Sequence, residues 1–209
     1  MARAGPFEKH TAEYEDWFIR HKFAYQSELE AIGELLPRGE KGIEIGVGSG
    51  RFAAPLAIQL GLDPSAKMGR AARQRGVDVV GGVAEALPFK NSTFDFALMV
   101  TTICFVDDLD SSFREAHRIL RPDGHLIIGF IDRASPIGQS YERRKADDLF
   151  YREATFYSVA EVTSVLRETH FREFVFSQTI FKNLADIHSV EPVERGYGKG
   201  SFVVLRAGK

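Results

Sequence analysis

GIEIGVGSG, residues 42–50, combines a short apolar strand with an acid and three alternating glycines. Glycine tolerates positive φ angles and lets the backbone approach a ligand closely, because it has no Cβ. Three glycines within five positions, Gly46, Gly48 and Gly50, therefore indicate a loop that folds against a bound molecule. A strand followed by such a loop is typical of a site for a nucleoside-containing cofactor.

The spacing of the glycines narrows the class of ligand. A dinucleotide-binding fingerprint has the pattern GxGxxG, and Arg51 stands where its third glycine would be. The pattern here is GxGxG, and Glu44 lies two residues before it. A carboxylate beside the loop suits a cationic ligand better than a pyrophosphate. S-adenosylmethionine, with its sulfonium and ammonium groups, is such a ligand.

Length and composition exclude several other classes of protein. The 209 residues are enough for one α/β domain, and the formal net charge of -2 gives no sign of a nucleic-acid or membrane partner. The single cysteine, Cys104, cannot form an internal disulfide, and the six histidines have no metal-ligand spacing. No run approaches the roughly 20 apolar residues that span a bilayer. We therefore expect a cytoplasmic protein with no metal and leave its oligomeric state open.

Buried strands and helices alternate along the chain. The expected strands are the run that ends before Gly46 and residues 57–63, 77–81, 94–100, 125–131, 173–181 and 200–206. Helices are expected at 51–56, 64–75 and 109–120, and another begins at the capping box Ser158-x-x-Glu161. Repeated strand–helix units imply an α/β fold with a mostly parallel sheet and helices on both faces. Ligands then bind beyond the carboxyl ends of the strands.

Five motifs in this order resemble those of a known family. They are Glu44-x-Gly46-x-Gly48-x-Gly50, Asp63-Pro64-Ser65, residues 84–89 (AEALPF), Phe94-Asp95 and residues 118–124 (RILRPDG). The chain resembles class I S-adenosylmethionine-dependent methyltransferases, and more narrowly the small-molecule group that includes the ubiquinone and menaquinone biosynthesis methyltransferases.

The resemblance implies a doubly wound, mostly parallel seven-stranded sheet, the Rossmann-like methyltransferase fold, in which the last strand is antiparallel. It also implies one domain over residues 1–209, with a helical cap at 1–36 and an insert after the fifth strand at 133–157. The implied activity is methyl transfer from S-adenosylmethionine to a small molecule.

The resemblance also implies roles for residues on the methionine side of the cofactor. Gly46, Gly48 and Gly50 would form the turn under the methionine part. Glu44 would orient that turn and favour the nearby ammonium group. Thr101, just past the fourth strand, would face both the methionine part and the substrate.

On the nucleoside side, the resemblance implies that Asp63 accepts hydrogen bonds from both ribose hydroxyls. Ala84 would offer its backbone N–H to an adenine ring nitrogen, with Leu87 or Met68 against the ring. Glu85 would either cap a helix or turn or contact the ligand. The family often has Asp before the Ala–Glu pair, where this chain has Val83. That departure leaves the contact to the adenine amino group open. A separate alternative is that Asp63 merely caps the next helix, a common use of Asp at such a position.

An aromatic stripe precedes the first strand. Tyr14, Trp17, Phe18, His21 and Tyr25 lie on one face of an expected helix. This face either docks on the core or, as in the resembling family, covers the cofactor and forms the acceptor pocket together with residues 133–157. If the reaction uses a base, His21 and Tyr14 are the candidates, because a neutral histidine suits proton removal near neutral pH.

Two other functions remain open at this stage. An NAD(P)-binding oxidoreductase shares the fold plan but is disfavoured by Arg51. A non-catalytic S-adenosylmethionine-binding protein would keep the same cofactor residues, because methyl transfer requires no particular catalytic side chain.

Overall fold

The computed structural model describes residues 4–37 and 41–209. Within this part of the chain, eight strands form one sheet in the order β3-β2-β1-β4-β5-β8-β6-β7. The strands are β1 (Gly42–Ile45), β2 (Leu60–Asp63), β3 (Asp78–Gly81), β4 (Phe94–Val100), β5 (Leu120–Ile131), β6 (Arg172–Thr179), β7 (Glu194–Arg195) and β8 (Phe202–Gly208). Strands β1 to β5 pair in parallel, whereas β8 is antiparallel to both β5 and β6.

The expected fold class is confirmed, and the strand count differs by one. The additional strand is β7, whose two residues pair with Ser177 and Gln178 of β6. It lies in a polar segment closed by Gly196 and Gly198, both at positive φ. Two residues are too few to show the alternation that marks a strand in a sequence.

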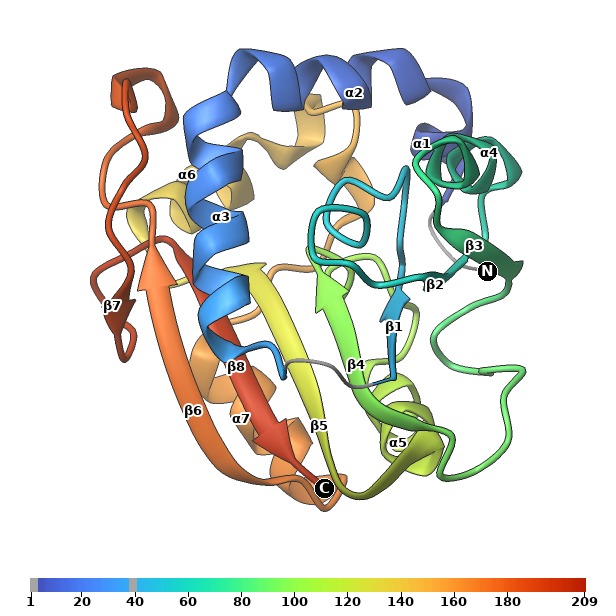
Figure 1. Ribbon diagram of the computed structural model, residues 1–209. Coiled ribbons are helices and arrows are strands. Elements are labelled where there is room, and N and C mark those ends of the chain that lie inside the picture. Colours follow the sequence, from blue (N-terminus) through green and yellow to red (C-terminus); the bar gives the residue numbers. More distant parts are fainter. Residues whose placement is uncertain (1–3, 38–40) are drawn as a thin grey trace.

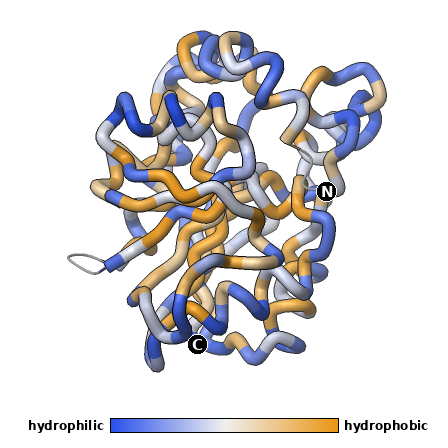
Figure 2. The backbone as a smooth tube through the Cα atoms, turned by 90° about the vertical axis from the view of Figure 1, so that its right-hand side faces the viewer, coloured by the Kyte–Doolittle hydropathy of each residue, from blue (hydrophilic) through white to orange (hydrophobic). Residues whose placement is uncertain are grey.

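Helices cover both faces of the sheet (Figure 1). They are α1 (Gly5–Lys9), α2 (Thr11–Arg20), α3 (Lys22–Leu35), α4 (Ala66–Gln74), α5 (Leu109–Ile119), α6 (Pro136–Arg144) and α7 (Val159–Glu168). Ala97 and Met99 of β4 pack with α5 and α7, whereas Phe96, Leu98 and Val100 pack with α3 and α4. Because successive side chains of a strand point to opposite faces, this one run of seven residues joins two cores. Figure 2 shows the strands as mainly hydrophobic segments between more hydrophilic outer ones.

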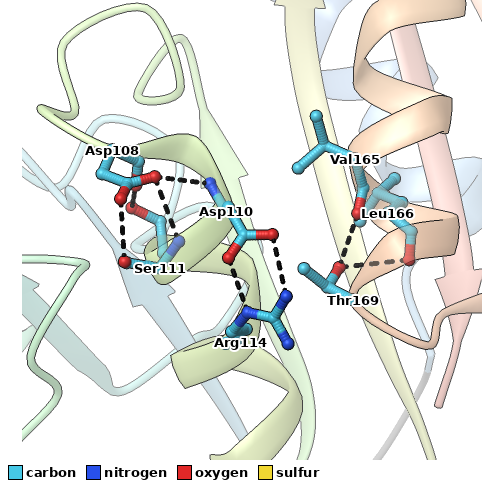
Figure 3. Close-up of polar contacts among 8 residues, drawn as sticks. Asp108, Asp110, Ser111, Arg114, Val165, Leu166 and Thr169 are labelled. Carbon is cyan, nitrogen blue, oxygen red and sulfur yellow. Dashed lines mark hydrogen bonds and ion pairs between the residues drawn. The ribbon is translucent and has the colours of Figure 1, made fainter.

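Local capping bonds set the ends of α5 and α7 (Figure 3). At the start of α5, the Asp108 carboxylate accepts hydrogen bonds from the backbone N–H groups of Asp110, at 3.0 Å, and Ser111, at 3.3 Å. Asp110 then pairs with Arg114 one turn later. At the end of α7, the Thr169 hydroxyl donates to two carbonyl groups of the last turn. The predicted capping box at the start of α7 is present.

The helix expected at 51–56 does not form. Residues 51–57 make a series of turns, with hydrogen bonds from Ala54 N to Gly50 O and from Ile58 N to Ala53 O. Ala57 ends the series at a φ of 57°. The chain has few residues in which to return from Gly50 to the start of β2, so tight turns replace a regular helix and β2 begins at Leu60 rather than at residue 57.

Two other boundaries differ from expectation. Helix α4 begins at Ala66, and Ser65 caps it by accepting a hydrogen bond from Met68 N. Strand β5 begins at Leu120 instead of residue 125, and Asp123, with a φ of 64°, lies in an irregularity within it.

The aromatic stripe lies on two helices, so the expectation of one helix is wrong. The backbone of His21 departs from helical geometry, at φ -111° and ψ 39°, and separates α2 from α3. Helix α3 runs along the face of the sheet, where it packs against β5, β6 and β8, whereas α2 crosses above the ends of the strands (Figure 1). No helix in the described residues is long and apolar enough to cross a membrane.

Candidate active site

A cavity of about 540 Å³ lies at the carboxyl ends of β1, β2 and β4. Its size is within the roughly 300–1,000 Å³ of small-molecule sites. Its walls come from these strand ends, from α2 above them, from α3 on the face of the sheet, and from the segment that follows β5. Of the residues predicted for the site, those that line it are Tyr14, His21, Gly46, Gly48, Asp63, Met68, Ala84, Glu85 and Thr101.

The glycine loop forms the floor of one half of the cavity. Gly46 has a φ of +74°, and a Cβ there would lie 2.4 Å from Cγ2 of Thr102. Gly48 has a φ of +53°, and a Cβ there would lie 3.2 Å from the Tyr14 hydroxyl. Positive φ angles favour glycine at both positions, and at Gly46 the lack of space for a Cβ adds to this requirement.

Asp63 joins the glycine loop to the start of α4. Its Oδ2 accepts a hydrogen bond from Gly48 N at 2.8 Å, and its Oδ1 accepts one from Ser65 N at 2.8 Å. Burial raises the pKa of this carboxyl group, and the two backbone hydrogen bonds oppose that rise. Since Ser65 caps α4, Asp63 is not the capping residue of this helix.

The loop after β3 contributes Ala84 and Glu85 to the cavity, and Met68 of α4 lies among the lining residues. Glu85 accepts a hydrogen bond from Asp107 N at 2.6 Å, which ties this loop to the segment before α5. Leu87 lies in the core and does not line the cavity.

Glu44 and Gly50 lie beneath the glycine loop and do not line the cavity. The Glu44 carboxylate is fully buried and accepts a hydrogen bond from the backbone of Ala53, and its Oε2 has no partner among the described residues. Burial raises its pKa well above the usual value. A Cβ at Gly50 would lie 3.1 Å from Cα of Ala72, so this glycine lets the loop pack on α4.

The N-terminal helices close the cavity from above. Tyr14, Trp17, Phe18 and His21 line it, whereas the Tyr25 hydroxyl donates to the carbonyl of Arg51 instead. Burial raises the pKa of Tyr14 and lowers that of His21, so both are neutral near pH 7. Glu8 of α1 accepts hydrogen bonds from Ser65 and Lys67, which fastens the N-terminal segment to α4.

The segment after β5 supplies an aromatic wall. The rings of Tyr141 and Tyr151 stack with centroids 5.0 Å apart, and that of Phe150 stacks on Phe7 at 5.3 Å. Cys104 is buried beside this wall with Phe156.

Glu28 is a lining residue that the sequence analysis missed. It lies on the buried side of α3, one turn after Tyr25, and burial raises its pKa to about 8. An acid continuing an otherwise apolar stripe, beside Ala24, Ala31 and Ile32, was the available signal. Among the described residues, no group of three or more His, Cys, Asp or Glu side chains could hold a metal ion.

The donor set fits S-adenosylmethionine. A glycine floor without space for side chains accepts a ligand that lies close to the backbone. The Asp63 carboxylate beside it suits hydroxyl donors. Glu44 lies beneath the loop with one carboxylate oxygen unpartnered, so it supports the loop and does not itself line the cavity.

Comparisons with known proteins agree with this chemistry. The family described as "Methyltransferase domain" matches residues 43–128. A solved S-adenosylmethionine-dependent methyltransferase of Thermotoga maritima, a "possible histamine N-methyltransferase", is 50% identical, covers 99% of both chains and superposes with a TM-score of 0.97. An uncharacterized protein of Methanocaldococcus jannaschii is 42% identical over 97% of this chain and 98% of its own length.

More distant relatives include the ubiquinone/menaquinone biosynthesis C-methyltransferase UbiE of Pasteurella multocida, which is 32% identical over 106 residues. This match covers 44% of the present chain and 40% of that enzyme. The relatives favour methyl transfer over the oxidoreductase and the non-catalytic binding protein. The chain belongs to the class I S-adenosylmethionine-dependent methyltransferases and is an enzyme whose cofactor is S-adenosyl-L-methionine.

Proposed function

We propose that this enzyme methylates a small molecule held in the same cavity as the cofactor. The observation that carries the proposal is that one cavity has two chemically different halves. The glycine loop and Asp63 line one half. Aromatic residues from α2 and from the segment after β5 line the other, and Tyr14 of α2 also reaches the glycine loop, where a Cβ at Gly48 would lie 3.2 Å from its hydroxyl. A cavity of this size suits a metabolite better than a folded macromolecule.

The cofactor brings the activated methyl group, so the chain's residues mainly bind, orient and exclude water. We assign Gly46, Gly48 and Glu44 to the methionine side and Asp63 to the ribose. The Ala84 N–H and the Met68 side chain are assigned to the adenine, with Leu87 and Gly50 supporting the loops from the core. Thr101, at a φ of 48° just past β4, lines the cavity, and we assign it to face both the methionine part and the substrate.

The domain plan of this proposal is one methyltransferase unit over residues 1–209. Residues 1–36 serve as a cap, of which 1–3 lie outside the described part, and 133–157 serve as the insert. His21 is the candidate base, because it lines the cavity and burial favours its neutral form. The raised pKa of Tyr14 favours its protonated form, which suits a hydrogen-bond donor.

The experiment incubates the enzyme with S-adenosylmethionine and pools of amines, phenols, thiols, carboxylic acids and quinols. S-adenosylhomocysteine release and a methylated product are measured by mass spectrometry. Amines are the first class to assay, since the Thermotoga maritima relative is called a possible histamine N-methyltransferase. Transfer to protein or RNA, with none to any small-molecule pool, would overturn the proposal.

A further inference from the structure

Glu28 is a carboxylate that the fold buries at the cavity without a partner. Only 5% of the residue is exposed, and it lines the cavity from α3. Within residues 4–37 and 41–209, its carboxylate makes no hydrogen bond and no ion pair, and desolvation is the cause of its raised pKa. A buried acid in this state destabilises the fold unless a ligand compensates it.

The other buried acids of the described residues have structural partners. Glu191 pairs with Lys182 at 3.0 Å and also accepts a hydrogen bond from Phe181 N at 2.8 Å. Asp132 accepts one from Ala134 N at 3.0 Å, and Glu44 accepts one from Ala53. Glu28 therefore differs from all three, because no contact within the described protein accounts for it.

The cavity as a whole is acidic. The described residues that line it include five carboxylates and one guanidinium, those of Glu13, Glu28, Asp63, Glu85, Asp148 and Arg20. Each carboxylate except Glu28 accepts a hydrogen bond from the protein. Arg20 pairs with Asp16 at 2.6 Å. Carboxyl groups thus outnumber cationic groups along the cavity, which favours a cationic ligand over an anionic one, and a cation beside Glu28 would favour its charged form.

Glu28 belongs to the half of the cavity that the nucleoside loops leave free. Strand β4 separates β1 and β2, which carry the glycine loop and Asp63, from β5, β8 and β6. Helix α3 packs over β5, β6 and β8. Burial is the main cause of the raised pKa of Tyr141, and the charge of Glu28 comes next. For Tyr151 the charge of Glu28 adds to burial after the effects of Tyr141 and Cys104, and it acts on Tyr14 and Tyr25 as well.

We propose that the Glu28 carboxylate binds a protonated basic nitrogen of the methyl acceptor, whose substrate class is therefore small cationic amines. This inference rests on the proposed function, since it names the acceptor of that same site. Aromatic rings of the insert complete the subsite, because cations are attracted to ring faces as well as to a carboxylate. Tyr141 and Tyr151, which line the cavity, are the candidates for this contact.

The test measures equilibrium binding and does not depend on turnover. Enzyme saturated with S-adenosylhomocysteine is titrated by calorimetry with histamine and 2-phenylethylamine, together with primary and secondary amines up to the size of tryptamine. Each amine is compared with the alcohol of the same shape, such as 2-phenylethanol for 2-phenylethylamine. We expect at least one amine to bind ten times more tightly than its alcohol, and Glu28→Gln to remove that preference.

Two further variants separate a specific role from general effects of charge. Glu30→Gln makes the same change of charge on the exposed side of α3 and should leave the amine preference within threefold. Glu28→Asp keeps the charge and should retain part of the preference. Binding of S-adenosylhomocysteine should remain within threefold in all three variants, which also shows that they are folded.

The outcomes distinguish this inference from the proposed function. If no amine binds more tightly than its alcohol, or if the preference persists in Glu28→Gln, the inference is wrong. Methyl transfer to an uncharged metabolite would overturn the inference and leave the proposed function standing. Transfer to no small molecule at all would overturn the proposed function itself.

Discussion

The burial of Glu28 predicts a specific dependence of stability on pH. Its pKa is raised from 4.5 to about 8 in the folded protein. Because the folded-state pKa is the higher one, the stabilising effect of the protonated acid is fully present below pH 4.5. It is lost as the pH rises through 8. The empty enzyme should therefore become less stable in alkali, and Glu28→Gln should not share this loss.

The magnitude follows from the displacement of the pKa. A rise from 4.5 to about 8 corresponds to roughly 5 kcal/mol in full, of which about 4 kcal/mol develops between pH 5 and pH 9. Tyr14, Tyr25, Tyr141 and Tyr151 also interact with Glu28, but their raised pKa values keep them protonated over this range. The advantage of Glu28→Gln over the parent should thus grow by about 4 kcal/mol.

Urea denaturation of the ligand-free protein at several pH values between 5 and 9 measures this difference. Glu30→Gln, on the exposed side of the same helix, should follow the parent within about 0.5 kcal/mol throughout, as expected for a surface substitution. A difference between Glu28→Gln and the parent that stays constant within about 1 kcal/mol would refute the assignment of Glu28 as a buried, uncompensated acid.

Three further predictions concern the rest of the cavity. Asp63→Ala should weaken S-adenosylhomocysteine binding at least about tenfold in calorimetry, since charge-assisted hydrogen bonds contribute about 1.5–3 kcal/mol each; unchanged affinity would leave Asp63 a purely structural role. Gly46→Ala should destabilise the fold by about 2 kcal/mol or more in urea denaturation, because its Cβ would meet a side chain at 2.4 Å. Gly196→Ala, also at positive φ but with nothing within 4 Å of its Cβ, should lose only about 1 kcal/mol in the same experiment. Trp17→Ala should lower the rate of methyl transfer at least about tenfold and leave cofactor affinity within threefold of the parent. Ile19→Ala, at a residue that is 68% exposed, should change neither quantity. If both variants lower the rate equally, the aromatic stripe only packs against the core.

Segments with strong local signals were predictable. Strand β4 has the predicted bounds, because a continuous apolar run between turn residues fits a strand buried on both faces. Helix α5 likewise follows its apolar spacing, and the capping box at Ser158 marks the start of α7. In each case the residues that decide the structure lie within a few positions of one another.

Segments decided by distant contacts were not predictable. A short helix is expected at 51–56, but the short path back to β2 forces turns there. The aromatic stripe has one helical period, yet α2 covers the ends of the strands while α3 packs on their face, so the chain bends at His21. Neither constraint can be read from the segment itself.

The two halves of the cavity differ in the same way: one could be predicted from local motifs and the other could not. The glycine loop, Asp63 and the loop at Ala84 each follow a strand within one contiguous region, so their motifs could be recognised locally. The other half is assembled from α2, α3, the insert and the ends of β5 and β6. Glu28 and Tyr141 are more than 100 positions apart, and only the folded chain brings them to one cavity.

Glu44 and Glu28 are two buried acids with raised pKa values and different physical explanations. Glu44 accepts a hydrogen bond from the backbone of Ala53 beneath the glycine loop, and this bond offsets part of the cost of desolvating its carboxylate. Glu28 accepts no such hydrogen bond within the described chain. Above its pKa of about 8, an amide at that position would remove a destabilising charge. Residues that break the rules of folding in this way are concentrated at functional sites, where a ligand supplies the missing interaction. The stability that Glu28→Gln gains in the empty enzyme and the amine affinity that it loses should therefore be two measurements of one uncompensated carboxylate.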